Sequence, residues 1–308
     1  MINNLQIKTC IDKMRKNMKL GVIGIGTWGK NLVRDFSKIS DIKYCTSNGK
    51  STNISWLKSN YPDIQYTKNT KKIFADDDID AVVISTPLKS HYNLVKKALL
   101  AKKHVFIEKP LAQNVTQCNE LLKISKKHNL LLFVGHVFLY HDIFSKIFDI
   151  SKKEKITFMN FEWNKFGTFD EDIFLNLLSH DLSIILTLFG NPSKIKLNNS
   201  YGLLSKSDFI HTSFEFKNIK LNIQINRCAN FSKKTVTIFS KKNIYVWDDD
   251  KLLKLNKKNN SYKPIYTSRK TPLENETKYF INQLTKKEIH YNSSKLAKDV
   301  IQLIQKLN

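Results

Sequence analysis

The sequence predicts an α/β fold: a doubly wound parallel sheet, followed by an α+β part with a mostly antiparallel, open sheet. Two observations predict it. Over residues 18–134, short apolar strands alternate with amphipathic helices; beyond residue 156, the strands alternate polar and apolar residues at hairpin spacing. Nearly continuous apolar strands separated by helices are typical of a parallel sheet that is covered on both faces. Alternating strands favour an antiparallel sheet with one exposed face.

The first part is built from short apolar runs with helices between them. We expect strands over residues 19–24, 42–45, 80–85, 104–107 and 130–134. The segments between them predict helices over residues 27–39, about 55–60, 90–102 and 115–128. In the first of these helices, large apolar residues recur at helical spacing along one side, which indicates an amphipathic surface helix.

The second part changes to β-branched and aromatic runs. We expect strands over residues 156–166, 209–216, 221–227, 235–239 and 243–247. Asn218 separates two of these runs and Lys241-Lys242 separates two others, which is hairpin spacing. One helix is expected over residues 173–189, ending at Gly190-Asn191-Pro192. Helices over residues 273–284 and 294–307 complete the chain.

The length of 308 residues favours two domains. We expect the first over residues 18–135 and a second, for substrate binding and oligomer formation, over residues 136–308 with the terminal helices. Residues 1–17 precede the first strand and are interpreted as an N-terminal extension that could be disordered.

Composition limits the classes of partner. The net charge is +24, but the lysines are spread along the chain and only four arginines are present, so we expect no nucleic-acid partner. A positive field attracts anionic small molecules.

No apolar run reaches the roughly 18–20 residues of a membrane span, and the N-terminus lacks the features of a secretory signal. Four scattered cysteines favour a reducing compartment and argue against zinc, so we expect a cytoplasmic protein without membrane or metal.

A glycine motif follows the first strand. Gly24, Gly26 and Gly29 match G-x-G-x-x-G, with Thr27 and Trp28 between the last two. The first glycine permits a tight turn, the second lets the backbone approach a pyrophosphate, and the third lets the helix pack on the strand. Because the motif stands between a strand and an amphipathic helix, it predicts a Rossmann domain that binds NAD or NADP.

The choice between the two dinucleotides depends on the end of the second strand. An acidic residue there would hold the 2′-hydroxyl of NAD, but the chain continues after Cys45 without a carboxylate. Ser47 and Asn48 are the candidates for contact with the ribose. Hydroxyl groups and a lysine could accept the 2′-phosphate of NADP, so the sequence leans slightly towards NADP, while direct bonding of the 2′-hydroxyl of NAD stays open.

Polar residues follow two further strands. Thr86-Pro87 ends one, with His91 about one helical turn later, and Glu108-Lys109-Pro110 ends another. Ligands in open α/β sheets bind at these carboxyl ends, so these residues are candidates for cofactor contact. In the second part, Asn176 and His180 share one helix face. His180 is either a satisfied core residue or a general base.

These motifs together resemble the Gfo/Idh/MocA family of sugar and cyclitol oxidoreductases, from Met18 to near the C-terminus. The resemblance is carried by the glycine loop, AVVISTP with His91, HVFIEKPLA and the SHD of residues 179–181. VGHVFLYH (134–141), SHDLSIILTLFG (179–190) and residues 233–249 are similar to one branch, whose members often oxidise nucleotide-linked sugars at C3.

The resemblance implies roles for individual residues. Glu108, Lys109 and Pro110 would lie beside the nicotinamide, with Lys109 near the reacting oxygen, and His180 would be the acid–base residue. Asn176 stands where the family usually has aspartate. An asparagine can form hydrogen bonds but has no negative charge to stabilise a protonated His180. Candidate substrate contacts are Tyr140, Asn164 and Lys165.

The implied activity is NAD(P)-dependent oxidation of a sugar hydroxyl to a ketone, acting on a nucleotide sugar in surface-polysaccharide biosynthesis. His180 would take the hydroxyl proton and Lys109 would stabilise the developing charge. The alternatives are a free-sugar or inositol-type dehydrogenase and a catalytically silent dinucleotide-binding sensor or scaffold. The resemblance also implies a homo-dimer or tetramer formed through the open sheet face.

Overall fold

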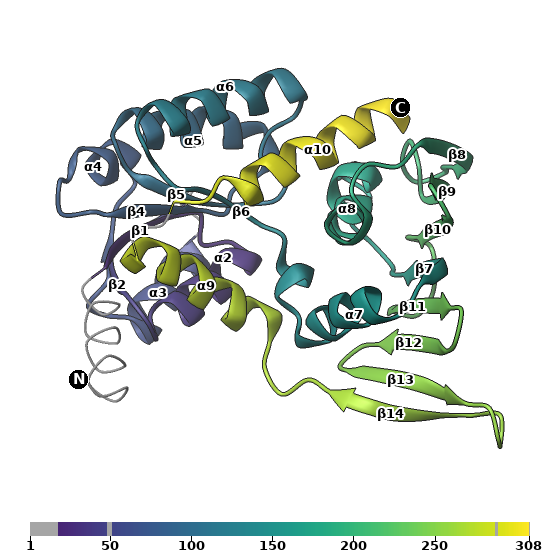
Figure 1. Cartoon of the computed structure of the whole chain (residues 1–308). Coiled ribbons are helices and arrows are strands. Elements are labelled where there is room, and N and C mark those ends of the chain that lie inside the picture. The colour runs from purple at the N-terminus through teal and green to yellow at the C-terminus, as the bar shows by residue number, and fades with distance from the viewer. Residues whose placement is uncertain (1–17, 48–50, 287–288, 308) are drawn as a thin grey trace. The chain divides into compact units, whose positions relative to one another are not determined.

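The computed structural model describes residues 18–47, 51–286 and 289–307 (Figure 1). The predicted N-terminal extension and the candidate ribose contact Asn48 lie outside these residues. The chain divides into two compact units, and the second is formed by residues 137–272 and 299–308. The first takes in the residues up to His136 and returns for Leu273–Lys298.

The first unit contains a parallel sheet of six strands in the order β3-β2-β1-β4-β5-β6. The strands are β1 (Lys19–Ile23), β2 (Asp41–Thr46), β3 (Gln65–Tyr66), β4 (Ala81–Ile84), β5 (His104–Glu108) and β6 (Leu132–Gly135). This order is that of the Rossmann fold, so the predicted fold class is confirmed. β3 was not predicted, because a strand of two residues is too short to show an alternation of polar and apolar side chains.

Helices cover both faces of this sheet (Figure 1). They are α2 (Thr27–Phe36), α3 (Ser51–Asn60), α4 (Thr70–Ala75), α5 (His91–Leu100), α6 (Val115–Lys127) and α9 (Pro272–Lys286). α5 and α6 pack together on one face, and α2, α3 and α9 lie on the other. α4 is a single short helix that the sequence analysis did not predict.

An aromatic cluster explains why α9 belongs to the first unit. Phe280 of α9 lies 5.4 Å from the ring of Phe106 on β5, 5.9 Å from Phe36 on α2 and 5.6 Å from Phe133 on β6. All four rings are fully buried. The expected boundary at residue 135 places α9 in the second part of the chain. The compact units place it in the first, where Phe280 is buried.

The second unit contains eight strands in the order β14-β13-β12-β11-β7-β10-β9-β8. They are β7 (Ile156–Asn164), β8 (Lys194–Tyr201), β9 (Phe209–Phe216), β10 (Ile219–Asn226), β11 (Lys233–Ser240), β12 (Ile244–Asp248), β13 (Lys251–Asn256) and β14 (Ser261–Thr267). All pairings are antiparallel except that of β7 with β10. The predicted hairpins at Asn218 and Lys241-Lys242 are confirmed, whereas β8, β13 and β14 were not predicted.

The second unit includes the α-helices α7 (Asp142–Lys153), which was not predicted, and α8 (Ser179–Phe189). The single helix predicted over residues 173–189 is instead a π-helical turn, η3 (Phe174–Leu178), that runs into α8. α8 ends at Gly190, whose φ of 74° is the left-handed conformation that suits glycine. α10 (Asn292–Leu307) starts in the first unit and ends in the second.

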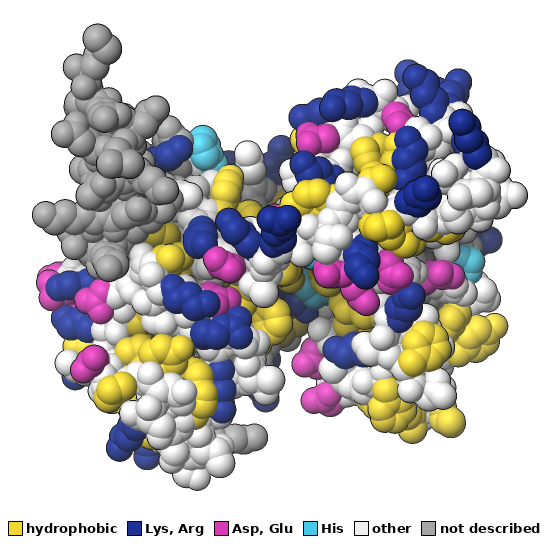
Figure 2. Space-filling model, turned by 90° about the horizontal axis from the view of Figure 1, so that it is seen from below, with side chains coloured by type: hydrophobic (Ala, Val, Ile, Leu, Met, Phe, Trp, Pro, Cys, Tyr) yellow, Lys and Arg dark blue, Asp and Glu magenta, His cyan; other side chains and the backbone are white. Residues whose placement is uncertain are grey.

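The charged surface shows no single basic stripe on the face drawn in Figure 2, where lysine and arginine side chains are scattered among Asp and Glu. Within the described ranges, no helix has the length and apolar character of a membrane span. The same residues contain no cluster of His, Cys, Asp and Glu that could hold a metal ion.

Candidate functional site

The glycine loop has the backbone geometry that its sequence predicts. Gly24 has a φ of 99°, and its amide donates a 2.9 Å hydrogen bond to the carbonyl of Thr46 at the end of β2. A Cβ on Gly24 would lie 2.2 Å from the carbonyl oxygen of Ser85, and one on Gly29 would lie 2.0 Å from that of Gly24. Both positions therefore require glycine, which locks β1, α2 and the end of β4 together.

Gly26 differs from the other two glycines because open space surrounds it. No heavy atom lies within 4 Å of the position that its Cβ would take. Gly26 is also the N-cap of α2, where no side chain caps the helix and the first turn carries no acidic residue. Exposed amide groups at a helix start, free of nearby negative charge, form an anion-binding site. The residues present therefore fit the pyrophosphate of a dinucleotide.

Trp28 joins this loop to the end of β5. Its indole Nε1–H donates a 2.5 Å hydrogen bond to Oε1 of Glu108. Burial raises the pKa of Glu108 to about 7, although the bond from Trp28 and the charge of Lys109 oppose the shift. Glu108 thus retains a proton over a wide pH range, and Lys109 follows it at the carboxyl end of the parallel strand.

Two buried polar groups beside Glu108 were missed in the sequence. Glu276 of α9 is fully buried, and neither of its carboxyl oxygens has a hydrogen-bond partner among the described residues. Burial, reinforced by the charge of Glu108, raises its pKa. His136 is also buried with both ring nitrogens unbonded in the described chain; burial and the charge of Lys109 lower its pKa to about 3.

His91 is buried between the turns that end β4 and β5. Its Nδ1 lies 2.7 Å from the carbonyl oxygen of Pro110, and its Nε2 lies 2.6 Å from that of Thr86. Burial lowers its pKa. Thr86 also shares a 2.7 Å hydrogen bond with the hydroxyl of Ser90, while Pro87 is exposed beside it. The imidazole thus ties together the two turns that carry the candidate cofactor contacts.

At the end of β2, Thr46 is buried and Ser47 is half-buried. The carbonyl of Ser47 accepts a 3.4 Å hydrogen bond from the hydroxyl of Tyr66. Neither residue carries a carboxylate, so in the described part of this strand end no acid is available to the 2′-hydroxyl of NAD.

In the second unit, His180 lies in the first turn of α8 against two aromatic rings. The Phe138 ring is 5.1 Å away at 86°, and the Trp163 ring is 5.7 Å away at 53°. His180 is only 9% exposed. The aromatic neighbours orient the imidazole and exclude water from part of its surface.

Lys234 lies over the same two rings and forms an ion pair with Asp181, and the sequence predicted no role for either residue. Lys234 Nζ is 2.5 Å from Oδ1 of Asp181, 3.9 Å from the centroid of Trp163 and 4.2 Å from that of Phe138. No local pattern signals this group, because β11, β7 and α8 are brought together only by the fold.

The remaining candidates are distributed around this part of the second unit. Asn176 lies in η3, where its backbone N–H donates a 2.8 Å hydrogen bond to the backbone carbonyl of Asp172. Tyr140 ends η2 (Val137–Tyr140), and Asn164 ends β7. The amide of Lys165 donates to the carbonyl of Asn226 at 2.9 Å. All four side chains are half-buried.

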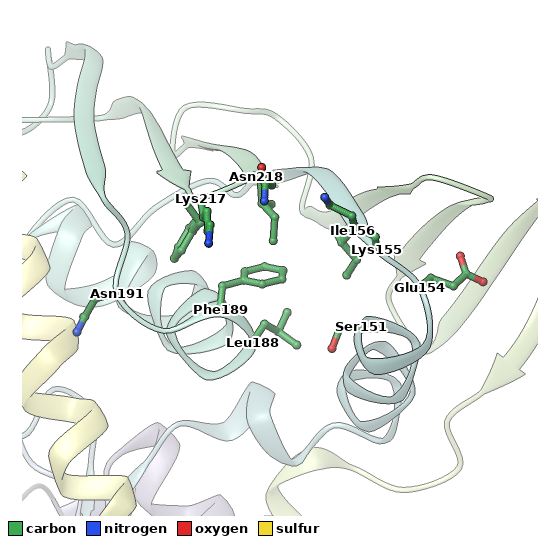
Figure 3. A pocket seen from close by; sticks show the side chains of 11 residues that line it. Ser151, Glu154, Lys155, Ile156, Leu188, Phe189, Asn191, Lys217 and Asn218 are labelled. Atoms are coloured by element: carbon green, nitrogen blue, oxygen red, sulfur yellow. The ribbon is translucent and has the colours of Figure 1, made fainter.

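A pocket of about 440 Å³ lies at the other end of α8 from His180 (Figure 3). It is lined by Leu188 and Phe189 of α8, Ser151 near the end of α7, and the β9–β10 turn at Lys217-Asn218. The Glu154 carboxylate at its edge is occupied by Ser240, Asn243 and Tyr245. This pocket is separate from the residues around His180.

The geometry of the first unit agrees with a family comparison. Residues 18–136 match the GFO_IDH_MocA family, described as "Oxidoreductase family, NAD-binding Rossmann fold". The matched range contains both the glycine loop and the Glu108-Lys109-Pro110 turn.

Two curated relatives are similar to part of the chain. An uncharacterized oxidoreductase YrbE of Bacillus subtilis is 34% identical over 146 residues, which are 46% of this chain and 42% of the relative. The myo-inositol 2-dehydrogenase of Thermotoga maritima is 31% identical over 119 residues, 38% of this chain and 36% of the relative. The chain thus matches less than half the length of these two relatives.

A solved structure extends the comparison to nearly the whole chain. UDP-N-acetylglucosamine 3-dehydrogenase GnnA from Acidithiobacillus ferrooxidans superposes with a TM-score of 0.85, covering 94% of this chain and 96% of that one. The sequence identity is 19%, so this likeness concerns the fold.

Proposed function

We propose that the chain is an NAD(P)-dependent dehydrogenase that oxidises a sugar hydroxyl to a ketone. The observation that carries the proposal is the bond from Trp28 to Glu108, which joins the glycine loop to the turn bearing Lys109. A cation at the carboxyl end of a parallel strand, next to a dinucleotide loop, suits stabilisation of an alkoxide as a hydroxyl is oxidised.

The first unit would hold the cofactor. The open backbone at Gly26 and the amides at the start of α2, through Thr27, would take the pyrophosphate, while Thr86 and Pro87 would border the nicotinamide side. When bound, the nicotinamide would take up the hydrogen and electron pair that leave the substrate carbon. Ser47 favours NADP slightly over NAD because it offers a hydroxyl and no carboxylate.

The first unit would contribute two positioning residues, His91 and Glu108, and one residue that contacts the reacting oxygen, Lys109. His91 holds the turns after β4 and β5 in register through their carbonyls, and Glu108 fixes Trp28. Lys109, which is half-buried, would donate to the reacting oxygen and stabilise its developing negative charge.

His180 would supply the base in the second unit. A neutral imidazole accepts the hydroxyl proton as the carbon–hydrogen bond breaks, and it returns that proton in the reverse direction. Asn176 would orient the substrate or the imidazole by hydrogen bonding without adding charge. Tyr140, Asn164 and Lys165 would contact the sugar.

A nucleotide sugar oxidised at C3 is the proposed substrate, in a surface-polysaccharide pathway. The fold shared with GnnA and the net charge of +24 support it, since a positive field attracts a sugar that carries a diphosphate. An inositol or free sugar is the second candidate, favoured by the identity to the myo-inositol 2-dehydrogenase.

The open sheet face of the second unit would join protomers into a dimer or tetramer, as sheets with one exposed face commonly do. Light scattering on the purified protein measures the oligomeric state. A monomer at all concentrations would contradict this part of the proposal.

The deciding experiment follows the appearance of reduced nicotinamide by absorbance, with NAD and NADP offered separately. We expect turnover with UDP-N-acetylglucosamine or with a GDP- or dTDP-sugar. Myo-inositol tests the second candidate. A protein that binds the cofactor but oxidises none of these substrates would favour the sensor or scaffold and overturn the proposed activity.

A further inference from the structure

Large hydrophobic side chains are exposed at one end of the sheet of the second unit. Leu203 is 93% exposed, and four others among the described residues there are more than half exposed: Phe166, Tyr201, Leu204 and Phe231. Phe166 follows β7, Tyr201 ends β8, the two leucines lie between β8 and β9, and Phe231 precedes β11. A single exposed apolar residue is ordinary on a protein surface, whereas a group of them marks a site of interaction.

The strands that carry these residues are neighbours in the sheet, in the order β11-β7-β10-β9-β8. Lys233 of β11 lies opposite Asn164 of β7, and the same register, continued by two residues, would bring Phe166 opposite Phe231. Neighbouring strands lie about 4.8 Å apart, so the five residues span an end of the sheet about 20 Å wide. They are called the loop patch below.

The buried side chain of Arg227 joins two of the loops that carry the patch. Its guanidinium donates hydrogen bonds to the carbonyls of Thr168 and Glu171, in the loop after β7. It also donates to the hydroxyl of Ser205 and to the carbonyl of Ser207, in the loop between β8 and β9. The loop that bears Phe166 and the loop that bears the leucines are therefore held in a fixed relation.

The backbone of the two leucines is fixed by a second buried group. Oδ2 of Asp208 accepts hydrogen bonds from the backbone N–H groups of Leu203 and Leu204, at 2.6 and 2.7 Å. Its Oδ1 accepts a 2.6 Å bond from the hydroxyl of Ser205. The leucine side chains thus project into solvent from an ordered loop. A partner that binds them has little loop entropy to overcome, because the loop is ordered in advance.

The size of the loop patch suits a protein interface. If a fully exposed residue of this size presents about 200 Å², the five residues present roughly 650 Å² to solvent. The largest apolar patch of an ordinary monomer covers roughly 300–600 Å². Two copies that meet through this surface would bury about 1,300 Å², within the range of roughly 1,200–2,000 Å² that is typical of stable interfaces.

The charges beside the patch indicate which partner would cover it. The loop after β7 exposes Asp170 and Glu171, and the loop between β8 and β9 exposes Lys206. In a two-fold arrangement each surface meets its own copy, so the acidic loop of one chain can face the lysine of the other. An anionic lipid surface would instead repel the two acids. The charges therefore favour a second copy of this chain.

We propose that the loop patch is a two-fold interface at which a second copy of this chain docks. This surface is separate from the open sheet face proposed above and does not depend on the proposed activity. A chain that uses both surfaces would form a tetramer, and a chain that uses the loop patch alone would form a dimer.

Light scattering over a range of protein concentrations tests the proposal. We expect the double variant Leu203→Lys with Leu204→Lys to halve the mass of the assembly and to weaken the association of the two copies about 100-fold or more, since it buries like charges in place of apolar contacts. Phe166→Ser with Phe231→Ser should act in the same direction and gives the test if the lysine variant does not fold. Thermal melting identifies the folded variants.

Leu100→Lys is the matched control, because Leu100 is an exposed leucine at the end of α5 in the first unit. Its mass should equal that of the wild type. A wild type that is monomeric at every concentration would overturn the proposal. An unchanged mass in the folded patch variants, or an equal loss in Leu100→Lys, would overturn it as well. If the open sheet face does not join protomers, the mass still falls, from dimer to monomer, so the two interfaces fail separately.

Carbodiimide cross-linking of mixed isotope-labelled and unlabelled protein shows which surfaces of two copies meet. We expect amide links from Lys206 of one copy to Asp170 or Glu171 of the other. Links between copies that involve only other surfaces would contradict the proposal.

Vesicles of phosphatidylglycerol test a lipid surface as the occupant. We expect the wild type not to sediment with them. Sedimentation of the wild type that is lost in Phe166→Ser with Phe231→Ser, at an unchanged mass, would assign the patch to a membrane and overturn the proposed interface.

Discussion

Trp28 and Glu108 are 80 residues apart in the chain and are joined by a 2.5 Å hydrogen bond from the indole Nε1–H to the carboxyl Oε1. This bond connects the first turn of α2 to the end of β5. It makes the glycine loop and the Lys109 turn one structural element, so a change in the charge of Glu108 acts on both.

The raised pKa of Glu108 predicts a pH-dependent contribution to stability. Its pKa of about 7 exceeds the ordinary carboxyl value of 4.5, so between these values the native protein holds a proton that the unfolded chain has lost. Stability from this group is therefore complete below about pH 4.5 and declines as the pH rises towards 7. One pKa unit corresponds to about 1.36 kcal/mol, so the free energy of unfolding falls by about 3 kcal/mol over this range.

Glu108→Gln should remove this dependence while keeping an acceptor for Trp28. Urea unfolding at several pH values measures the free energy of unfolding of both proteins. The advantage of the glutamine variant should grow by about 3 kcal/mol between pH 4 and pH 8. Parallel curves for the two proteins would contradict the assignment.

Two glycines of the same loop should respond differently to alanine. Gly29→Ala forces a Cβ against the Gly24 carbonyl and should destabilise the protein by about 2–3 kcal/mol. Gly26→Ala meets open space and should leave the melting temperature nearly unchanged, but the new methyl group would crowd the pyrophosphate and weaken cofactor binding about tenfold or more. Thermal melts and fluorescence titration with NADH and NADPH separate the two effects. Normal cofactor affinity in Gly26→Ala would argue against binding at this loop.

Lys109 should matter for turnover more than for folding. Lys109→Ala is expected to lower kcat about 10²–10³-fold, as loss of one charge-stabilising donor commonly does. Lys123→Ala, at an exposed position of α6, is the matched control and should retain full activity. Steady-state kinetics on the active sugar measures both. Unchanged turnover in Lys109→Ala would remove this residue from the mechanism.

Arg227 should be a major determinant of stability in the second unit. Its guanidinium is 1% exposed and donates to the carbonyls of Thr168, Glu171 and Ser207, at 2.5–2.7 Å, and to the Ser205 hydroxyl at 2.6 Å. Arg227→Ala removes the donor of these buried and part-buried bonds and leaves the buried Asp208 carboxylate, 3.7 Å away, without its cation, so we expect a loss of about 3–5 kcal/mol.

The exposed Arg269 provides the comparison for this measurement. Arg269→Ala should change the free energy of unfolding by less than about 0.5 kcal/mol. Urea unfolding of both variants gives the two values. Similar small losses in both would show that the buried bonds of Arg227 do not hold the loop that precedes η3.

The elements with strong local signals were predictable from the sequence. The apolar strands of the first unit and the helix after the glycine loop follow from periodicity, because residues adjacent in sequence determine both. β3, α4 and β8 carry short or half-exposed patterns, so their positions depend on neighbours that the pattern does not show. The helix over residues 173–189 was predicted as one piece, since apolar spacing does not distinguish a π-helical turn from an α-helix.

The sequence by itself determined the Rossmann fold and the glycine loop, because a strand, a tight turn and a helix are encoded by consecutive residues. Only the tertiary structure decided which distant groups meet: Trp28 with Glu108, His91 with two backbone carbonyls, Phe280 with the core of the first unit, and Lys234 with Asp181. The physical reason is that burial and opposing charge act between atoms close in space. In each of these cases the partners come from separate elements of the chain.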